Sequence, residues 1–254
     1  MFGQVRELLT NYGRIDLLWF DGQWEHTAEE WRARELAAMC RELQPGILIN
    51  DRLPGEGEYA TFENLVPAQP PEGPWEVCMT MNESWGYNAA DPHYKSALEL
   101  VHTLCEVAGR GGNLLLDVSP RGDGTLPPEQ EVRLDAIEGW MAQQGAAIVG
   151  TRAALEPWQF YGPATRREGE AGTTLYLHLI LRPYASVVVR GVPVRRVKSA
   201  RLLATGEALK YRVRTTIENA MQEQDPTGDV TIYVPERLLD PLATIVALEF
   251  VGKL

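Results

Sequence analysis

The sequence is poor in several residues and patterns that mark common classes of protein. Its three cysteines, Cys40, Cys78 and Cys105, lie in apolar surroundings without metal-ligand spacing, so neither a disulfide framework nor a zinc site is expected. No apolar run approaches the ~20 residues that cross a bilayer. The amino terminus carries charges where a signal peptide needs an apolar stretch. We therefore expect a soluble, cytoplasmic protein without a membrane partner.

Positive charge and histidine are also scarce. The 254 residues include 24 Lys and Arg against 35 Asp and Glu, which gives a net charge of −11. No basic stripe is available to neutralise phosphates, which argues against nucleic acid as a partner. No two of the four histidines have metal-ligand spacing, and no Gly-x-Gly-x-x-Gly follows a predicted strand. We therefore expect no metal and no nucleotide cofactor.

The first 150 residues alternate apolar strands with amphipathic helices. A capping box, Thr27 with Glu30, opens the helix after the first strand. Residues 53–74 are rich in proline and glycine and predict a long loop. Four β/α units in succession predict a parallel sheet with right-handed crossovers. The predicted strands cover residues 15–20, 47–50, 75–82 and 113–118.

The pattern changes at about residue 155, where helical periodicity disappears. Short β-rich runs separated by turns predict an antiparallel, sandwich-like domain of about a hundred residues. The sequence therefore predicts two domains, residues 1–153 and residues 154–254. The β-rich runs cover residues 174–181, 186–189, 194–203, 230–234 and 244–251.

Polar residues follow the predicted strands at the edge where α/β folds carry their chemistry. The first strand ends at Asp21, followed by Gly22, which makes Asp21 a candidate catalytic residue. A turn or helix-capping aspartate is the alternative interpretation. Arg52 follows the second strand and would stand at the same edge. Asp117 ends the fourth strand, where we expect a structural hydrogen-bonding role.

Three motifs follow one another along the chain. They are Tyr-Gly at 12–13 running into Leu-Leu-Trp-Phe-Asp-Gly at 17–22, Trp-Glu-x-Cys-Met-Thr at 75–80 closed by Trp-Gly-Tyr at 85–87, and Asn-Leu-Leu-Leu-Asp-Val-Ser-Pro at 113–120 with Gly-Asp-Gly at 122–124. Taken in this order, they resemble the retaining α-L-fucosidase family of glycoside hydrolases. The β-rich tail is similar to the carboxy-terminal domain of that family, so the resemblance spans essentially the whole chain.

The resemblance implies hydrolysis of terminal α-L-fucosides with retention, through a covalent fucosyl-enzyme intermediate. Asp21 matches the nucleophile and Glu76 the acid/base, with Glu58 and Glu63 as alternatives for the proton-transfer role. Retention requires one carboxylate that attacks the anomeric carbon and a second carboxyl that donates and then accepts a proton. Two carboxyl groups suffice for this chemistry, so no cofactor is implied.

Several further residues are candidates for binding a fucosylated oligosaccharide or glycoside. Arg52 would bind hydroxyls from its strand end, although a salt bridge to a neighbouring acid is equally consistent with its position. Trp19, Trp75 and Trp85 would stack on a sugar face, with core packing as the alternative for each. His26 lies four residues beyond Gly22 and would reach the same site.

The sequence also departs from the family. The resemblance implies a preceding segment with the first barrel strands and a His-His-Asp-Gly-Phe motif, which this sequence does not contain. We therefore expect a chain truncated at the amino terminus: half of a (β/α)8 TIM-like barrel followed by an antiparallel β-sandwich. An open half-barrel would leave apolar surface uncovered, which predicts a homo-oligomer through that surface. The alternative to an enzyme is a catalytically silent carbohydrate-binding or structural remnant.

Overall fold

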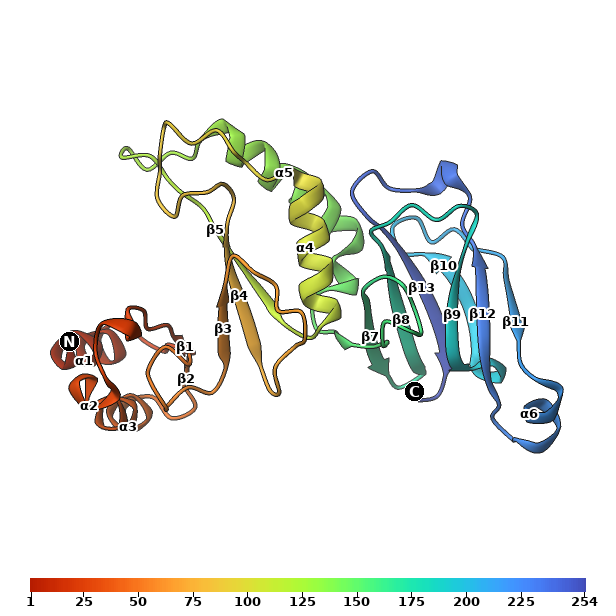
Figure 1. The fold of residues 1–254 in the computed structure, drawn as a ribbon, viewed down its shortest axis with the longest axis horizontal. Helices are drawn as coiled ribbons and strands as arrows, with labels where there is room; N and C mark the ends of the chain where they lie inside the picture. Colours follow the sequence, from red (N-terminus) through yellow and green to blue (C-terminus); the bar gives the residue numbers. More distant parts are fainter. The chain divides into compact units, whose positions relative to one another are not determined.

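The computed structural model describes residues 1–254, which form two compact units, Met1–Cys78 and Met79–Leu254 (Figure 1). The first unit combines helices with short parallel strands, and the second adds antiparallel sheets. An α/β segment followed by antiparallel strands agrees with the order of elements predicted from the sequence.

The core of the first unit lies between its helices and residues at and beside strand β2. The helices are α1 (Phe2–Asn11), α2 (Ala28–Trp31) and α3 (Ala33–Leu43). The predicted capping box is present, since Thr27 Oγ1 accepts from Glu30 N at 3.3 Å and Thr27 N donates to Glu30 Oε2 at 2.8 Å. The predicted single helix is broken at Arg32, whose φ of 51° lies in the left-handed region. The core includes Val5, Leu9, Leu36, Cys40 and Ile49.

The strands of the first unit pair in parallel over short distances. β1 (Leu17–Leu18) pairs with β2 (Leu48–Ile49), and β3 (Ala60–Glu63) pairs with β4 (Trp75–Thr80). The predicted loop over residues 53–74 therefore contains a strand, β3. Its sequence, Ala-Thr-Phe-Glu, is too short to show a period among the surrounding prolines and glycines.

The second unit holds two antiparallel sheets over one apolar core. The five-stranded sheet has the order β10-β13-β8-β7-β6, and the three-stranded sheet has the order β11-β12-β9. Alternate residues of both sheets meet in the core, among them Leu175, Leu177, Val189, Ile232 and Leu248. The strands are β6 (Arg152–Ala153), β7 (Ala164–Gly169), β8 (Gly172–Leu179), β9 (Ser186–Pro193), β10 (Val197–Leu202), β11 (Tyr211–Arg214), β12 (Thr227–Tyr233) and β13 (Thr244–Val251).

Two helices cover the other face of the five-stranded sheet (Figure 1). The second unit also contains β5 (Asn113–Asp117), which lies between α4 (Ala97–Gly109) and α5 (Pro128–Gln144). Buried Gln144 ties α5 to the sheet, donating to Ala243 O at 2.7 Å and accepting from Ile245 N at 2.8 Å. These helices thus share a core with strands of the predicted second domain. Antiparallel pairing begins at the predicted boundary at 153/154, with strand β6. The chain divides into compact units between Cys78 and Met79, and the limit at 153/154 stays a prediction.

Two further properties concern the whole chain. None of its helices combines the length and the apolar character that a membrane crossing requires. No group of three or more His, Cys, Asp or Glu side chains is arranged to hold a metal ion.

His178 in β8 is fully buried and electrically neutral. Its Nε2 lies 3.0 Å from Thr165 Oγ1, and that hydroxyl donates its proton to Ala147 O at 2.6 Å. The imidazole therefore donates from Nε2, and its Nδ1 is a buried acceptor without a partner. Burial lowers the pKa of His178 to about 3. The folded state thus does not bind the proton that the unfolded chain binds below its pKa of ~6.5.

The free energy of unfolding should therefore fall as the pH drops below ~6.5, by at most ~1.4 kcal/mol per pH unit from this group, until its folded-state pKa is reached. We expect H178Q to remove this share of the pH dependence. Urea unfolding at several pH values between 7.5 and 4.5 measures it, with exposed His93→Gln as the control. Parallel pH curves for H178Q and the unsubstituted protein would contradict the assignment.

Candidate active site

A buried asparagine fixes the backbone that carries Asp21. β1 and β2 pair over only two residues, and beyond them the Asn50 side chain continues the connection between the strands. Its Oδ1 accepts from Phe20 N at 2.8 Å, and its Nδ2 donates to Phe20 O at 2.9 Å. Gly22 follows Asp21 with a φ of 85°, a left-handed conformation that glycine adopts without strain. Asp21 is thereby held on a turn, with 57% of its side chain exposed.

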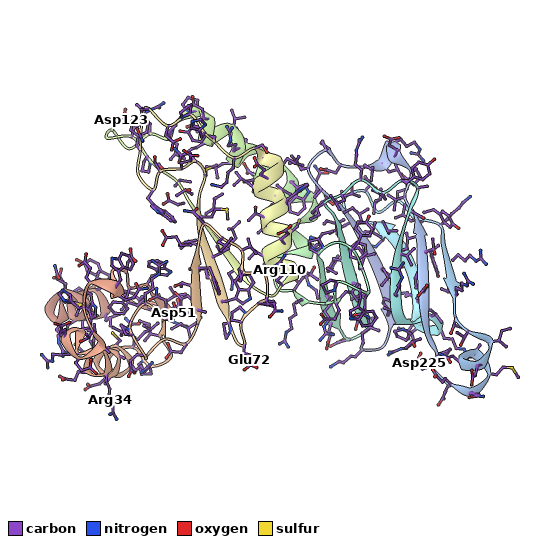
Figure 2. The ribbon with its side chains drawn as sticks, in the orientation of Figure 1. Arg34, Asp51, Glu72, Arg110, Asp123 and Asp225 are labelled. Carbon is purple, nitrogen blue, oxygen red and sulfur yellow. The ribbon has the colours of Figure 1, made fainter.

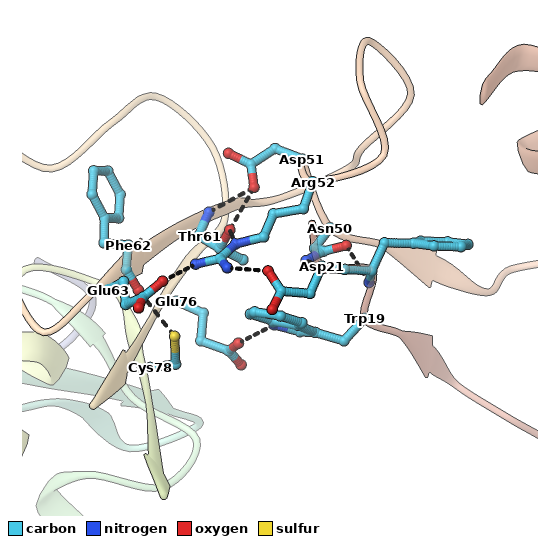
Figure 3. A network of polar contacts seen from close by, with 11 residues as sticks. Trp19, Asp21, Asn50, Asp51, Arg52, Thr61, Phe62, Glu63, Glu76 and Cys78 are labelled. Atoms are coloured by element: carbon cyan, nitrogen blue, oxygen red, sulfur yellow. Dashed lines mark hydrogen bonds and ion pairs between the residues drawn. The ribbon is translucent and has the colours of Figure 1, made fainter. Parts of the chain in front are cut away.

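Arg52 connects three elements of the site. Its side chain is 7% exposed, and its Nη1 donates to Asp21 Oδ1 at 2.6 Å while its Nη2 donates to Glu63 Oε2 at 3.0 Å (Figure 3). The guanidinium carbon lies 4.5 Å from the centroid of the Trp19 ring, a cation–π contact. Burial alone lowers the pKa of Arg52, but the hydrogen bonds to Asp21 and Glu63 outweigh it and raise that pKa. The salt-bridge role left open for Arg52 is thus present.

A threonine and an aspartate hold the remaining side of the guanidinium. Arg52 Nε donates to Thr61 Oγ1 at 3.1 Å, and the same hydroxyl donates to Asp51 Oδ1 at 2.6 Å. Asp51 also accepts from Thr61 N at 3.1 Å, which ties the end of β2 to β3 (Figure 3). Neither Asp51 nor Thr61 was assigned a role from the sequence. The adjacent Asp-Arg pair after the second strand was the available signal.

Trp19 joins Glu76 to this network. Its Nε1 donates to Glu76 Oε1 at 3.0 Å, so one indole touches Arg52 with its face and Glu76 with its edge (Figure 3). Glu76 lies on β4 between buried Trp75 and Val77, and the strand alternation therefore turns its half-buried side chain to the opposite face. The structure thus brings together four predicted residues: Asp21, Glu76, Arg52 and Trp19.

The two alternative carboxylates have different surroundings. Glu58 Oε1 pairs with Arg41 Nη2 at 2.6 Å, and its Oε2 accepts from Ile49 N at 2.7 Å. Those bonds tie β2 to the helix α3 and give Glu58 a structural place outside the network. Glu63 belongs to the network, as the second carboxylate bound by Arg52.

Three other predicted binding residues lie outside the network. Trp75 is 1% exposed and packs edge-to-face on Phe62 with ring centroids 5.9 Å apart, which is the core-packing alternative rather than an open stacking surface. His26 contacts the Trp31 ring at 5.5 Å, and its Nδ1 lies 3.8 Å from Glu30 Oε2. Trp85 belongs to the second unit, where it is 42% exposed.

Two of the buried polar groups that lack a hydrogen-bond partner lie in segments discussed in the sequence analysis. The hydroxyl of Tyr59 is one, and burial together with the charges of Glu76 and Asp51 raises its pKa. Tyr59 lies in the segment predicted to be a loop, where nothing in the sequence marked it. The second is Asp117 Oδ2, and burial raises the pKa of that carboxyl. The hydrogen-bonding role expected for Asp117 is not observed for this oxygen.

Carboxylates gathered around a buried arginine and an indole, at the ends of parallel strands, define a site of the kind found in glycoside hydrolases. Comparison with known proteins identifies the family. The α-L-fucosidase family model matches residues 1–146, more than half of the chain. The chain therefore belongs to the α-L-fucosidase family, as its motifs indicated.

Individual relatives match nearly all of this chain but are much longer. The tissue α-L-fucosidase of Mus musculus is 26% identical over 263 residues, covering 99% of this chain and 55% of its own length. The structure of α-L-fucosidase isoenzyme 1 from Paenibacillus thiaminolyticus has a TM-score of 0.83 at 35% identity, covering 98% of this chain and 61% of that one. An α-L-fucosidase from Bacteroides thetaiotaomicron, trapped as a covalent intermediate with 2-fluoro-fucosyl fluoride, has a TM-score of 0.78 at 26% identity, covering 96% of this chain and 59% of that one.

The Thr61 hydroxyl can be removed without a change of shape. In T61V, Asp51 Oδ1 loses the hydroxyl donor and Arg52 Nε loses its acceptor, so we expect the free energy of unfolding to fall by about 1–2 kcal/mol. T61S keeps the hydroxyl and should lie close to the unsubstituted protein. Urea unfolding measures both, and equal losses in T61V and T61S would contradict the positioning role.

Proposed function

We propose that this chain carries the catalytic carboxylates of a retaining α-L-fucosidase that hydrolyses terminal α-L-fucosides. The observation that carries the proposal is the cation–π contact between Arg52 and Trp19. It joins the Asp21–Arg52 hydrogen bond to the Trp19–Glu76 hydrogen bond and so links the two carboxyls in one polar network. The covalent intermediate of the Bacteroides thetaiotaomicron relative supports the same chemistry here. No cofactor is required, because two carboxyl groups supply both steps.

Asp21 fits the nucleophile by its accessibility and by the way it is held. Arg52 binds Oδ1 and leaves Oδ2 without a hydrogen bond, on a side chain that is more than half exposed. Its Oδ2 would attack the anomeric carbon while Glu76 donates a proton to the leaving glycosidic oxygen. In the second step Glu76 would remove a proton from water, and that water would displace Asp21 from the sugar with net retention.

Glu76 suits the proton-transfer role better than Glu63. Glu63 shares the guanidinium of Arg52 with Asp21, so it is held as part of the ion-pair cluster around the proposed nucleophile. Glu76 is bound by the neutral indole N–H of Trp19, which orients the carboxyl without placing a full charge beside it. This single donor leaves the other oxygen of Glu76 available for proton transfer.

The finer architecture belongs to the same proposal. We propose that the parallel strands are half of a (β/α)8 barrel and that the two antiparallel sheets form a β-sandwich. The high TM-scores against longer fucosidases support this placement of the chain within the fold. Cytoplasmic localisation likewise stays a prediction.

The direct test is release of phenol from an aryl α-L-fucoside by the purified protein. D21A should abolish turnover, and azide should partly restore it by replacing the missing nucleophile. E76A should slow substrates with poor leaving groups by ~10²–10⁴-fold and activated aryl fucosides far less, because only the former need the proton. E72A, in the loop before β4, is the matched control and should retain full activity (Figure 2).

Full activity of D21A would end the assignment of the nucleophile. A slow E63A with an unaffected E76A would transfer the acid/base role to Glu63. Absence of turnover, combined with saturable binding of fucose, would favour the catalytically silent carbohydrate-binding remnant.

We also propose that the chain self-associates through the β1–β2 strands. Leu17 and Leu48 are partners in the parallel register and are 42% and 46% exposed. Val77, another apolar residue on the strands of the first unit, is fully buried. The exposed apolar surface is therefore smaller than the surface expected for an open half-barrel. Two adjacent exposed leucines on a sheet mark a surface suited to association.

Sedimentation at micromolar concentration should show a homo-oligomer that L48E weakens. Leu65, which is 69% exposed in the loop after β3, provides the control variant L65E, which should leave association unchanged. A soluble monomer over the same concentration range would contradict this proposal.

A further inference from the structure

A hollow of about 240 Å³ lies at the open edge of β7 in the second unit. Its volume is several times the ~30 Å³ that a water molecule occupies in the liquid. Strand β6 covers this edge over only two residues, so the second half of β7 has no neighbour on that side. The hollow is lined by Gly150, Arg152, Arg166, Arg167 and Glu168.

Two arginines stand directly opposite each other at this edge. Arg152 of β6 is the register partner of Arg166 of β7, and like charges in such positions repel. Arg152 has no hydrogen bond or ion pair from its side chain. The Nε of Arg166 is buried without a hydrogen-bond partner, and the carboxylate facing it, Glu168 Oε1, is 3.8 Å away. Neither guanidinium is neutralised at hydrogen-bond distance.

A third arginine is fixed beside them by backbone carbonyls. Arg167 Nη2 donates to Ala146 O at 2.9 Å and also to Val149 O. Three arginines and one glutamate therefore line the hollow, a local charge of +2 in a chain whose net charge is −11. A concave site with one sign of charge concentrates the opposite ion.

The backbone adds a donor to the same edge. His178 N donates to Pro163 O, which places residues 163, 165 and 167 in hydrogen-bonded pairs with β8. The backbone N–H groups of Arg166 and Glu168 therefore point away from β8, toward the side of β7 where β6 lies. The N–H of Arg166 faces β6, while that of Glu168 lies beyond the end of β6 and faces the hollow.

An adjoining hollow of about 490 Å³ shares Gly150 and Arg152 with the first. This second hollow has room for an uncharged part of a ligand next to the arginines. Its other lining residues combine apolar side chains with polar ones, namely Leu104, Ala108, Leu114 and Ile148 with Asn113 and Thr151.

We propose that the arginines of this edge bind the tetrahedral oxyanion of a sulfated or phosphorylated sugar, whose ring enters the adjoining hollow. Arginine binds sulfate and phosphate oxygens through parallel charge-assisted hydrogen bonds, and two facing guanidinium groups would share one such anion. This site is separate from the carboxylate network and does not depend on turnover.

The probes are inorganic sulfate, inorganic phosphate, glucose 6-sulfate and glucose 6-phosphate, titrated at constant ionic strength set with sodium chloride. Saturable shifts of the backbone amide signals of Gly150 and Glu168 in NMR spectra would report binding at the edge. We expect R152Q and R166Q each to weaken binding by about tenfold, a loss typical of one hydrogen bond to a charged group. Comparison of the sulfate and phosphate arms identifies which ester the site prefers.

R190Q is the matched control, because Arg190 is an exposed arginine of β9 without a side-chain partner and the substitution removes the same charge. It should leave the affinity unchanged. Equal weakening in R190Q, or shifts that do not saturate, would overturn the site. Esters that bind no tighter than the inorganic ions would overturn the placement of the sugar ring in the adjoining hollow.

Discussion

A buried guanidinium is stable only if its charge is balanced and its donors are satisfied, and Arg52 determines much of the first unit's geometry for that reason. Its three nitrogens bind Asp21, Glu63 and Thr61, which come from the turn after β1 and from β3. Loss of any one partner would leave a buried donor unpaired, at a cost of about 1–3 kcal/mol. The charge requirement of one residue thus sets where two strand ends lie relative to each other.

Side-chain hydrogen bonds extend the pairing of the very short strands in this part of the fold. β1 and β2 pair over two residues each, too few for a ladder to define the position of Asp21. Asn50 extends the pairing by binding both backbone groups of Phe20, and the Asp51–Thr61 contact does the same between β2 and β3. Asn50 and Asp51, which make these contacts, directly follow the apolar run of β2 and directly precede Arg52 in the sequence.

The sequence was sufficient to predict the elements whose patterns are long and to place Asp21 and Arg52 at strand ends. The capping box at Thr27, the amphipathic helices of the first 150 residues and the antiparallel runs after residue 155 all carry periodic or positional signals. It could not predict β3, because four residues among prolines show no period. It could not separate stacking from packing for Trp75, since both roles need the same side chain and only burial distinguishes them. The domain limit was difficult for a related reason: the core shared by α4, α5 and the five-stranded sheet joins residues about a hundred positions apart, such as Gln144 and Ile245.

The contrast between Glu63 and Glu76 shows why the contacts of a carboxylate matter more than its type. They lie on adjacent parallel strands, and Glu63 connects to Asp21 through Arg52 alone, whereas Glu76 connects through Trp19 and then Arg52. Glu63 reaches Asp21 through the cation of Arg52, which forms ion pairs with both carboxylates at once. Glu76 reaches the network through an uncharged donor, whose hydrogen bond orients an oxygen while adding no net charge. Under the proposed mechanism, Asp21 bound by the guanidinium of Arg52 would act as the nucleophile, and Glu76 oriented by the indole of Trp19 would transfer the proton. The unlike partners of these two carboxyls match the unlike roles that retaining catalysis needs.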